Sequence, residues 1–119
     1  MNKIVKGLMI AGTLGASLMA FTRTADAKDK DGNIVIVIDP GHGGEDPGSL
    51  ATTGVTESKC NYAIAEVMKK ELSKYDGVKV YLTREEDTWM TNMGRAMIAA
   101  DLNADFLIST HIIGSFSII

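Results

Sequence analysis

The stretch Asn33-Ile-Val-Ile-Val-Ile38, followed by Asp39-Pro-Gly41, decides the fold. Its five consecutive β-branched residues predict a strand that is buried on both faces, as in a parallel sheet. Pro40 has no backbone N–H to donate to a sheet ladder, so we expect the strand to end there. A glycine-rich loop then extends to about Thr56. The sequence therefore predicts an α/β protein built around this strand.

Helical and strand patterns alternate beyond that loop. Apolar residues recur at helical spacing over 58–75 and again over 88–102, where Thr88 is the expected N-cap. Short apolar runs at 78–82 and 105–109 predict two more strands. The order β-α-β-α-β with short connections predicts three layers, α/β/α, around a mainly parallel sheet. The apolar positions of the two helices are Cys60, Ile64, Val67, Met68, Leu72 and Tyr75, then Trp89, Met93, Met97 and Ala100.

The first 27 residues have the pattern of a secretory signal peptide. A basic start is followed by the uncharged residues 7–21 and by Ala25-Asp-Ala27, a small-x-small cleavage pattern. The alternative is a retained membrane anchor, but these fifteen residues are short for a span, which needs about 20. We therefore expect export to the cell wall or periplasm, with no stable membrane anchor after cleavage. Residues 28–32 would form a flexible lead-in and residues 33–119 the domain.

Composition and charge argue against several classes of protein. The 119 residues carry a formal net charge of −3, whereas a nucleic-acid binder usually has a basic face. A single cysteine excludes a disulfide scaffold. This residue, Cys60, lies on the apolar side of the first helix, where we expect a small buried hydrophobe rather than a reactive thiol. The loop 41–44 lacks the Lys and Ser/Thr of a P-loop, which disfavours nucleotide binding.

Both histidines of the chain follow the ends of predicted strands. His42 comes after the first strand and His111 after the third, and parallel strands open at the same edge of a sheet. Glu57 begins the first helix and offers a carboxylate. Two imidazoles and a carboxylate, with a fourth position left to water, are typical of a hydrolytic zinc site. Each residue also has a structural alternative. His42 could form a hydrogen bond within its loop, Glu57 could interact favourably with the helix dipole, and His111 could be a hydrogen-bonded polar residue at the end of its strand.

Several motifs occur in one order along residues 33–111. They are Ile36-Val-Ile-Asp-Pro-Gly-His-Gly-Gly-Glu-Asp-Pro-Gly48, Gly54-Val-Thr-Glu-Ser-Lys-Cys-Asn61, Val80-Tyr-Leu-Thr-Arg84 with Asp87, Arg95, and Ser109-Thr-His111. Together they resemble the zinc-dependent N-acetylmuramoyl-L-alanine amidases, the family called Amidase_3. The resemblance implies a three-layer α/β fold, with zinc held by His42, Glu57 and His111. It also implies a bacterial enzyme that acts on peptidoglycan, where it cleaves the amide between N-acetylmuramic acid and L-alanine of the stem peptide.

The sequence departs from that family after the third strand. Ile112 and Ile113 follow His111, where the family usually has a small residue and then asparagine. The family also continues with further strands and a late catalytic glutamate, whereas no acidic residue follows Asp105 here. We therefore expect a domain that is incomplete at its C-terminus, has no identified catalytic base, and is weakly active or inactive. The alternative function is a remnant that retains only metal or cell-wall binding.

Other polar residues near these motifs are candidates for supporting roles. We expect each ligand imidazole to donate its other N–H to an acceptor, and Asp39 is a candidate because it is close to His42 in sequence. Arg84 and Arg95 are candidates for binding carboxylates of the stem peptide. Their alternative role is to brace the sheet edge by pairing with Asp87 or Glu86. Glu45 and Asp46 are candidates for a replacement base.

Overall fold

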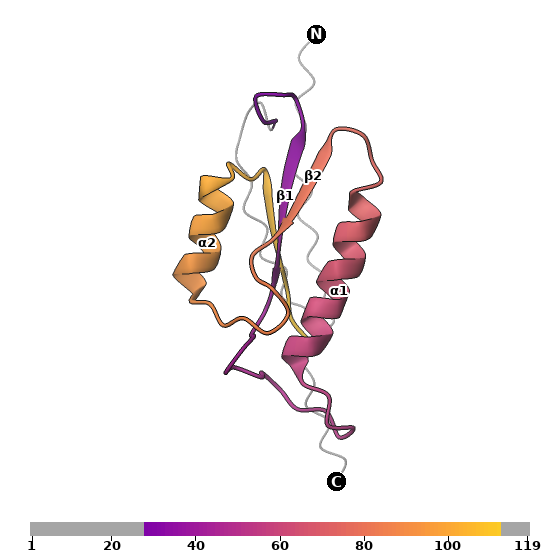
Figure 1. The fold of residues 1–119 in the computed structure, drawn as a ribbon, viewed down its shortest axis with the longest axis vertical. Helices are drawn as coiled ribbons and strands as arrows, with labels where there is room; N and C mark the ends of the chain where they lie inside the picture. The colour runs from indigo at the N-terminus through magenta and orange to yellow at the C-terminus, as the bar shows by residue number, and fades with distance from the viewer. Residues whose placement is uncertain (1–27, 113–119) are drawn as a thin grey trace, which may run out of the picture.

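The structure, a computed structural model, describes residues 28–112 (Figure 1). Its strands form one parallel sheet in the order β2-β1-β3, which confirms the predicted α/β fold. The expected signal peptide, residues 1–27, lies outside the described residues, as do residues 113–119. In chain order the elements are β1 (Ile34–Pro40), α1 (Glu57–Leu72), β2 (Val78–Leu82), α2 (Asn92–Asp101) and β3 (Phe106–Thr110).

The sheet lies between the two helices, as the three-layer prediction requires (Figure 1). Successive side chains of a strand point to opposite faces. Ile36 and Ile38 of β1 therefore share one face, where they form the core with Ala65 of α1 and Val80 of β2. Val37, which is fully buried, points to the other face, on the side of α2. The central strand is thus buried on both faces, as its unbroken β-branched sequence predicts.

The helices begin and end at residues other than those predicted. Thr56 caps α1, and Thr91 rather than Thr88 caps α2, where its hydroxyl accepts a hydrogen bond from the backbone N–H of Gly94 at 3.0 Å. The first helix ends at Leu72, before the predicted Tyr75. Neither helix of the described residues has the length and apolar character that crossing a bilayer requires.

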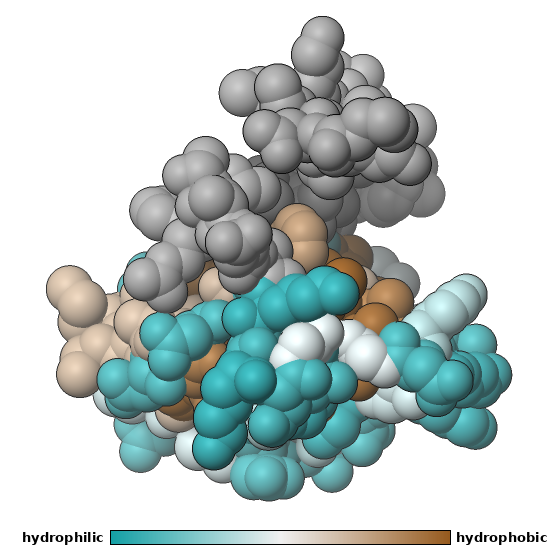
Figure 2. Space-filling model, turned by 90° about the horizontal axis from the view of Figure 1, so that it is seen from above, coloured by the Kyte–Doolittle hydropathy of each residue, from teal (hydrophilic) through white to brown (hydrophobic). Residues whose placement is uncertain are grey.

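The apolar side predicted for α2 faces solvent. Met93 and Met97 are 70% and 55% exposed, and Figure 2 shows apolar surface on the side of the molecule where α2 lies. The helix buries Arg95 and Ala99 instead. The reason is that this face of the sheet ends in a carboxylate and in loop carbonyls, which need hydrogen-bond donors rather than methionine side chains. Cys60 of α1 is only half-buried.

Residues 28–32, for which the sequence predicts a flexible lead-in, form a turn beside the first two strands. The Asp29 carboxylate accepts hydrogen bonds from the backbone N–H groups of Asn33 at 2.8 Å and Asp31 at 2.9 Å. It also pairs with Lys79 of β2 at 2.7 Å. The Lys79 ammonium and the Asn33 N–H hold the pKa of Asp29 well below its usual range. These contacts attach the turn to the sheet.

A buried carboxylate closes the connection between α2 and β3, and it gives a test of the fold. Asp105 Oδ2 accepts a hydrogen bond from the backbone N–H of Val35 at 2.7 Å. We expect Asp105→Ala to lower the free energy of unfolding by about 1–3 kcal/mol, because it leaves that buried donor unpaired. Urea unfolding measures the change. The exposed residue Asp101 is the control, since Asp101→Ala should shift stability by less than about 0.5 kcal/mol. Equal effects of the two substitutions would contradict this role.

Candidate metal centre

The loop after β1 turns back on itself at His42. This residue has φ of 61°, in the left-handed region that non-glycine residues rarely adopt. Beyond it, the backbones of Gly43 and Asp46 exchange two hydrogen bonds, at 2.8 and 3.1 Å. The turn places Asp46 Oδ2 2.8 Å from Nδ1 of His42. The His42 imidazole and the backbone N–H of Gly48 hold the pKa of Asp46 below its usual range. The ionised carboxylate therefore accepts a hydrogen bond from the Nδ1–H group, and Nε2 of His42 remains available as a ligand atom.

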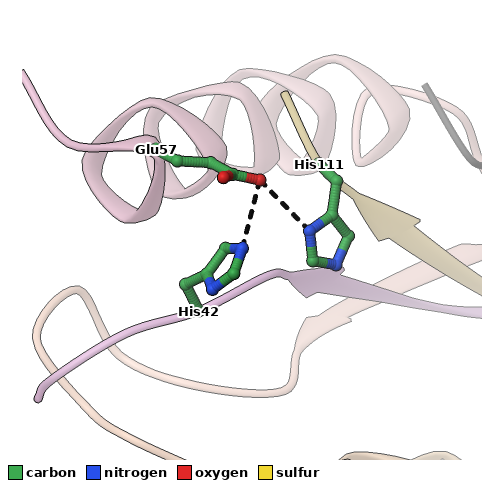
Figure 3. A group of neighbouring side chains, drawn as sticks. All are labelled: His42, Glu57 and His111. Atoms are coloured by element: carbon green, nitrogen blue, oxygen red, sulfur yellow. Dashed lines mark hydrogen bonds and ion pairs between the residues drawn. The ribbon is translucent and has the colours of Figure 1, made fainter. Parts of the chain in front are cut away.

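Three side chains from different parts of the chain meet at the carboxyl edge of the sheet (Figure 3). His42 follows β1, Glu57 opens α1, and His111 follows β3. Glu57 Oε1 lies 3.2 Å from Nε2 of His42 and 3.2 Å from Nδ1 of His111. The two rings meet edge to face, with centroids 5.1 Å apart. One ligand atom of each residue lies within 4.8 Å of the others, so the group could hold a metal ion.

Glu57 is the buried member of this group, with 8% of its surface exposed. Burial by itself disfavours the charged carboxylate. Hydrogen bonds from Ser49 and the neighbouring imidazoles outweigh burial, and they hold the pKa of Glu57 at about 2. The backbone N–H of Ser49 donates to Oε2 at 2.9 Å, and that of Ile112 donates to Oε1 at 3.2 Å. Glu57 is therefore ionised near neutral pH, as a carboxylate ligand of a metal must be.

Two glycines of the loop make room for these side chains. A Cβ atom on Gly41 would overlap the imidazole ring of His111. A Cβ atom on Gly48 would lie 2.6 Å from His42 Cδ2 and 2.8 Å from Glu57 Oε2. Gly48 also has φ of 64°, which favours glycine. The glycine-rich sequence of the loop thus reflects close approach to the three candidate ligands.

Asp39, the candidate acceptor for a ligand imidazole, has other hydrogen-bond partners in the structure. Its carboxylate accepts hydrogen bonds from Thr83 Oγ1 at 2.6 Å, Arg95 Nη1 at 2.9 Å and Ser109 Oγ at 2.9 Å. The alternation of side chains along β1 turns Asp39 toward α2, away from His42. Asp46 contacts the imidazole instead.

Arg84 and Arg95 are buried, with 4% and 6% of their surface exposed. Arg84 donates to the backbone carbonyls of Pro40, Gly41, Ser58, Glu85 and Glu86. Arg95 donates to those of Pro40, His42 and Met90, and it pairs with Asp39. These contacts favour the bracing alternative over binding of substrate carboxylates. The partners are mainly backbone carbonyls, rather than the predicted side chains of Asp87 and Glu86.

The comparison with known protein families decides the ancestry of the chain. A family model described as N-acetylmuramoyl-L-alanine amidase, Amidase_3, matches residues 36–116. The chain belongs to this amidase family. The match includes His42, Glu57 and His111, and it confirms the resemblance that the sequence motifs indicate.

Individual members of the amidase family resemble the chain over part of their length. The amidase AmiC of Escherichia coli O6:H1 is 37% identical over 82 residues, which are 69% of this chain and 20% of that protein. The probable amidase AmiB of Haemophilus influenzae is 39% identical over 79 residues, or 66% of this chain and 18% of that protein. The chain therefore spans about a fifth of the length of these curated relatives.

Solved amidase structures share the fold. The catalytic domain of CwlV, an N-acetylmuramoyl-L-alanine amidase from Bacillus (Paenibacillus) polymyxa var. colistinus, is 33% identical with a TM-score of 0.67. The alignment covers 71% of this chain and 48% of the CwlV domain. The amidase of Clostridium difficile 630 has a TM-score of 0.68 at 33% identity, with coverage of 72% of this chain and 49% of that one.

Proposed function

We propose that the chain is a zinc-dependent N-acetylmuramoyl-L-alanine amidase, which hydrolyses the amide between N-acetylmuramic acid and L-alanine in peptidoglycan. The observation that carries this proposal is the convergence of His42, Glu57 and His111 in a chain of the amidase family. Two imidazole nitrogens and a carboxylate oxygen match the donor set of a catalytic zinc site, which leaves a fourth position for water.

The residues of the site would divide the work of holding the ion. His42 through Nε2, His111 through Nδ1, and Glu57 through its carboxylate are the ligands we propose. Asp46 keeps the His42 proton on Nδ1 and so directs the lone pair of Nε2 into the site. When bound, zinc supplies Lewis acidity that polarises a carbonyl and lowers the pKa of a coordinated water toward about 7.

The proposed substrate lies outside the cytoplasm, which agrees with the signal-peptide pattern of the first 27 residues. We propose export to the cell wall or periplasm, cleavage after Ala27, and a domain over residues 33–119. We propose peptidoglycan as the binding partner of this acidic chain. We propose neither nucleic-acid binding nor a stable membrane anchor after cleavage.

Metal analysis of the purified protein tests the ligand assignment. We expect about one zinc ion per parent chain after loading and dialysis, and less than about a tenth of that in His42→Ala, because three protein ligands are needed to hold a catalytic zinc. Asp101→Ala, which changes an exposed helix residue, is the control and should retain the zinc of the parent. Equal zinc content in the parent and His42→Ala would refute the assignment.

A second candidate function is metal or cell-wall binding without hydrolysis. It is favoured by the absence of a suitably placed base among the carboxylates near His42 in the described part of the chain. Asp46 is bonded to His42, and Glu45 is exposed to solvent. Pelleting with peptidoglycan measures binding, and release of stem peptides measures hydrolysis. Pelleting without release would favour this second function.

A further inference from the structure

Two guanidinium groups bind three successive carbonyls of the loop that carries His42. Arg84 donates from Nε to Pro40 O at 2.8 Å and from Nη2 to Gly41 O at 3.0 Å. Arg95 donates from Nη1 to Pro40 O at 2.8 Å and from Nη2 to His42 O at 2.9 Å. The two arginines come from the loop after β2 and from α2, so two separate elements hold the same turn of backbone.

This arrangement is costly in electrostatic terms. Burial lowers the pKa of Arg84, and the neighbouring charge of Arg95 lowers it further. Among the described residues, Arg95 forms an ion pair with Asp39 at 2.9 Å. Removing two cations from water is unfavourable unless hydrogen bonds satisfy their donors. The charge-assisted hydrogen bonds to the loop carbonyls provide that compensation. Burial of the two arginines therefore holds this turn of backbone in place.

The backbone that they hold is itself strained. His42 has positive φ, and a non-glycine residue keeps such a conformation only where its surroundings impose it. Arg95 contacts the carbonyls on both sides of Gly41, those of Pro40 and His42, while the same Nη1 reaches Asp39. A planar guanidinium can meet these acceptors together, whereas the ammonium of lysine is a single point of charge.

We propose that Arg95 is a positioning residue of the metal centre, which holds the His42 carbonyl so that the imidazole stays between Asp46 and Glu57. The part of this proposal that concerns metal affinity rests on the proposed zinc function. Arg95 does not touch the candidate ligand atoms: it contacts the backbone of His42 and leaves the ring to the two carboxylates. Its loss should therefore weaken the site without removing a ligand.

Zinc affinity of the Arg95→Lys protein, measured by competition with a chelator, tests the proposal. Lysine retains the charge beside Asp39 but cannot reproduce the fork. We expect zinc to bind about 10–100-fold more weakly, the usual effect of losing a residue that orients a ligand. Asp105→Ala is the matched control, because it disrupts a buried hydrogen bond in another part of the sheet and should leave the affinity of the folded protein unchanged. Parent affinity in Arg95→Lys, or equal weakening in both variants, would overturn the proposal.

Nitrogen NMR of the imidazoles in the zinc-free protein gives an independent readout. In the parent and in Asp105→Ala, we expect His42 to show a proton on Nδ1, bonded to Asp46. In Arg95→Lys that signature should be lost, while the His111 signals stay as in the parent; an unchanged His42 signature would overturn the proposal. If the parent binds no zinc, the proposed function fails, and this spectrum alone decides the positioning role. Should Arg95→Lys not fold, the double variant D39N/R95Q removes both charges and carries the same expectations.

Discussion

Gly41→Ala is expected to weaken zinc binding by at least about 100-fold, at the upper end of the effects seen for residues around a metal site. The added Cβ would overlap the imidazole of His111, one of the three proposed ligands. The backbone cannot easily retreat, because the Gly41 N–H donates to Thr110 O at 3.0 Å and its carbonyl accepts from Arg84. The ring must therefore move, and it leaves its position beside Glu57.

Chelator competition with purified Gly41→Ala measures this loss. Gly94→Ala is the control, because a Cβ there would meet only the flexible side chain of Met90 at 3.1 Å and a threonine hydroxyl at 3.2 Å. The control should bind zinc as the parent does. Circular dichroism of both variants shows whether the sheet and helices persist. Parent-like affinity in a folded Gly41→Ala protein would mean that His111 is not a ligand in the geometry described.

The sequence predicts the fold well because its strongest signal is local. Five β-branched residues in a row leave the strand without a polar face, so they indicate a strand that is covered on both faces. The placement of His42 and His111 after such strands then follows from parallel topology, which brings the strand ends to one edge. Glu57 joins them because Thr56 caps α1 one residue earlier, at the same edge.

Other features depend on backbone geometry that residue patterns do not show. Asp46 reaches His42 only because the loop turns back through a left-handed residue. Likewise, the sequence pattern predicts that the side of α2 with the methionines is buried, whereas the structure buries the side with Arg95. Arg95, Ala99 and Leu102 recur at helical spacing, and an arginine can bury its aliphatic stem on a side with small and apolar residues.

The 119-residue chain is expected to release stem peptides from peptidoglycan about 10²–10⁴-fold more slowly than a chimera that extends it with the C-terminal segment of a solved amidase domain. That range is the usual contribution of a positioned general base. Zinc ligands and a base are separate requirements. The described residues supply candidates for the ligands, whereas Asp46 is bonded to His42 and Glu45 is exposed. None of residues 106–119 is acidic, so we expect the added segment of the chimera to supply the base.

The CwlV catalytic domain provides the segment for the chimera, since this chain covers 48% of it. Both proteins are assayed for stem-peptide release after zinc loading, and their zinc content is measured first, so that a lost metal is not mistaken for a lost base. We expect equal zinc content and unequal hydrolysis. Comparable hydrolysis by the two proteins would mean that the base lies within the 119 residues. Glu45 would then be the first residue to substitute, because the Asp46 carboxylate is already hydrogen-bonded to His42 Nδ1 and to the backbone N–H of Gly48.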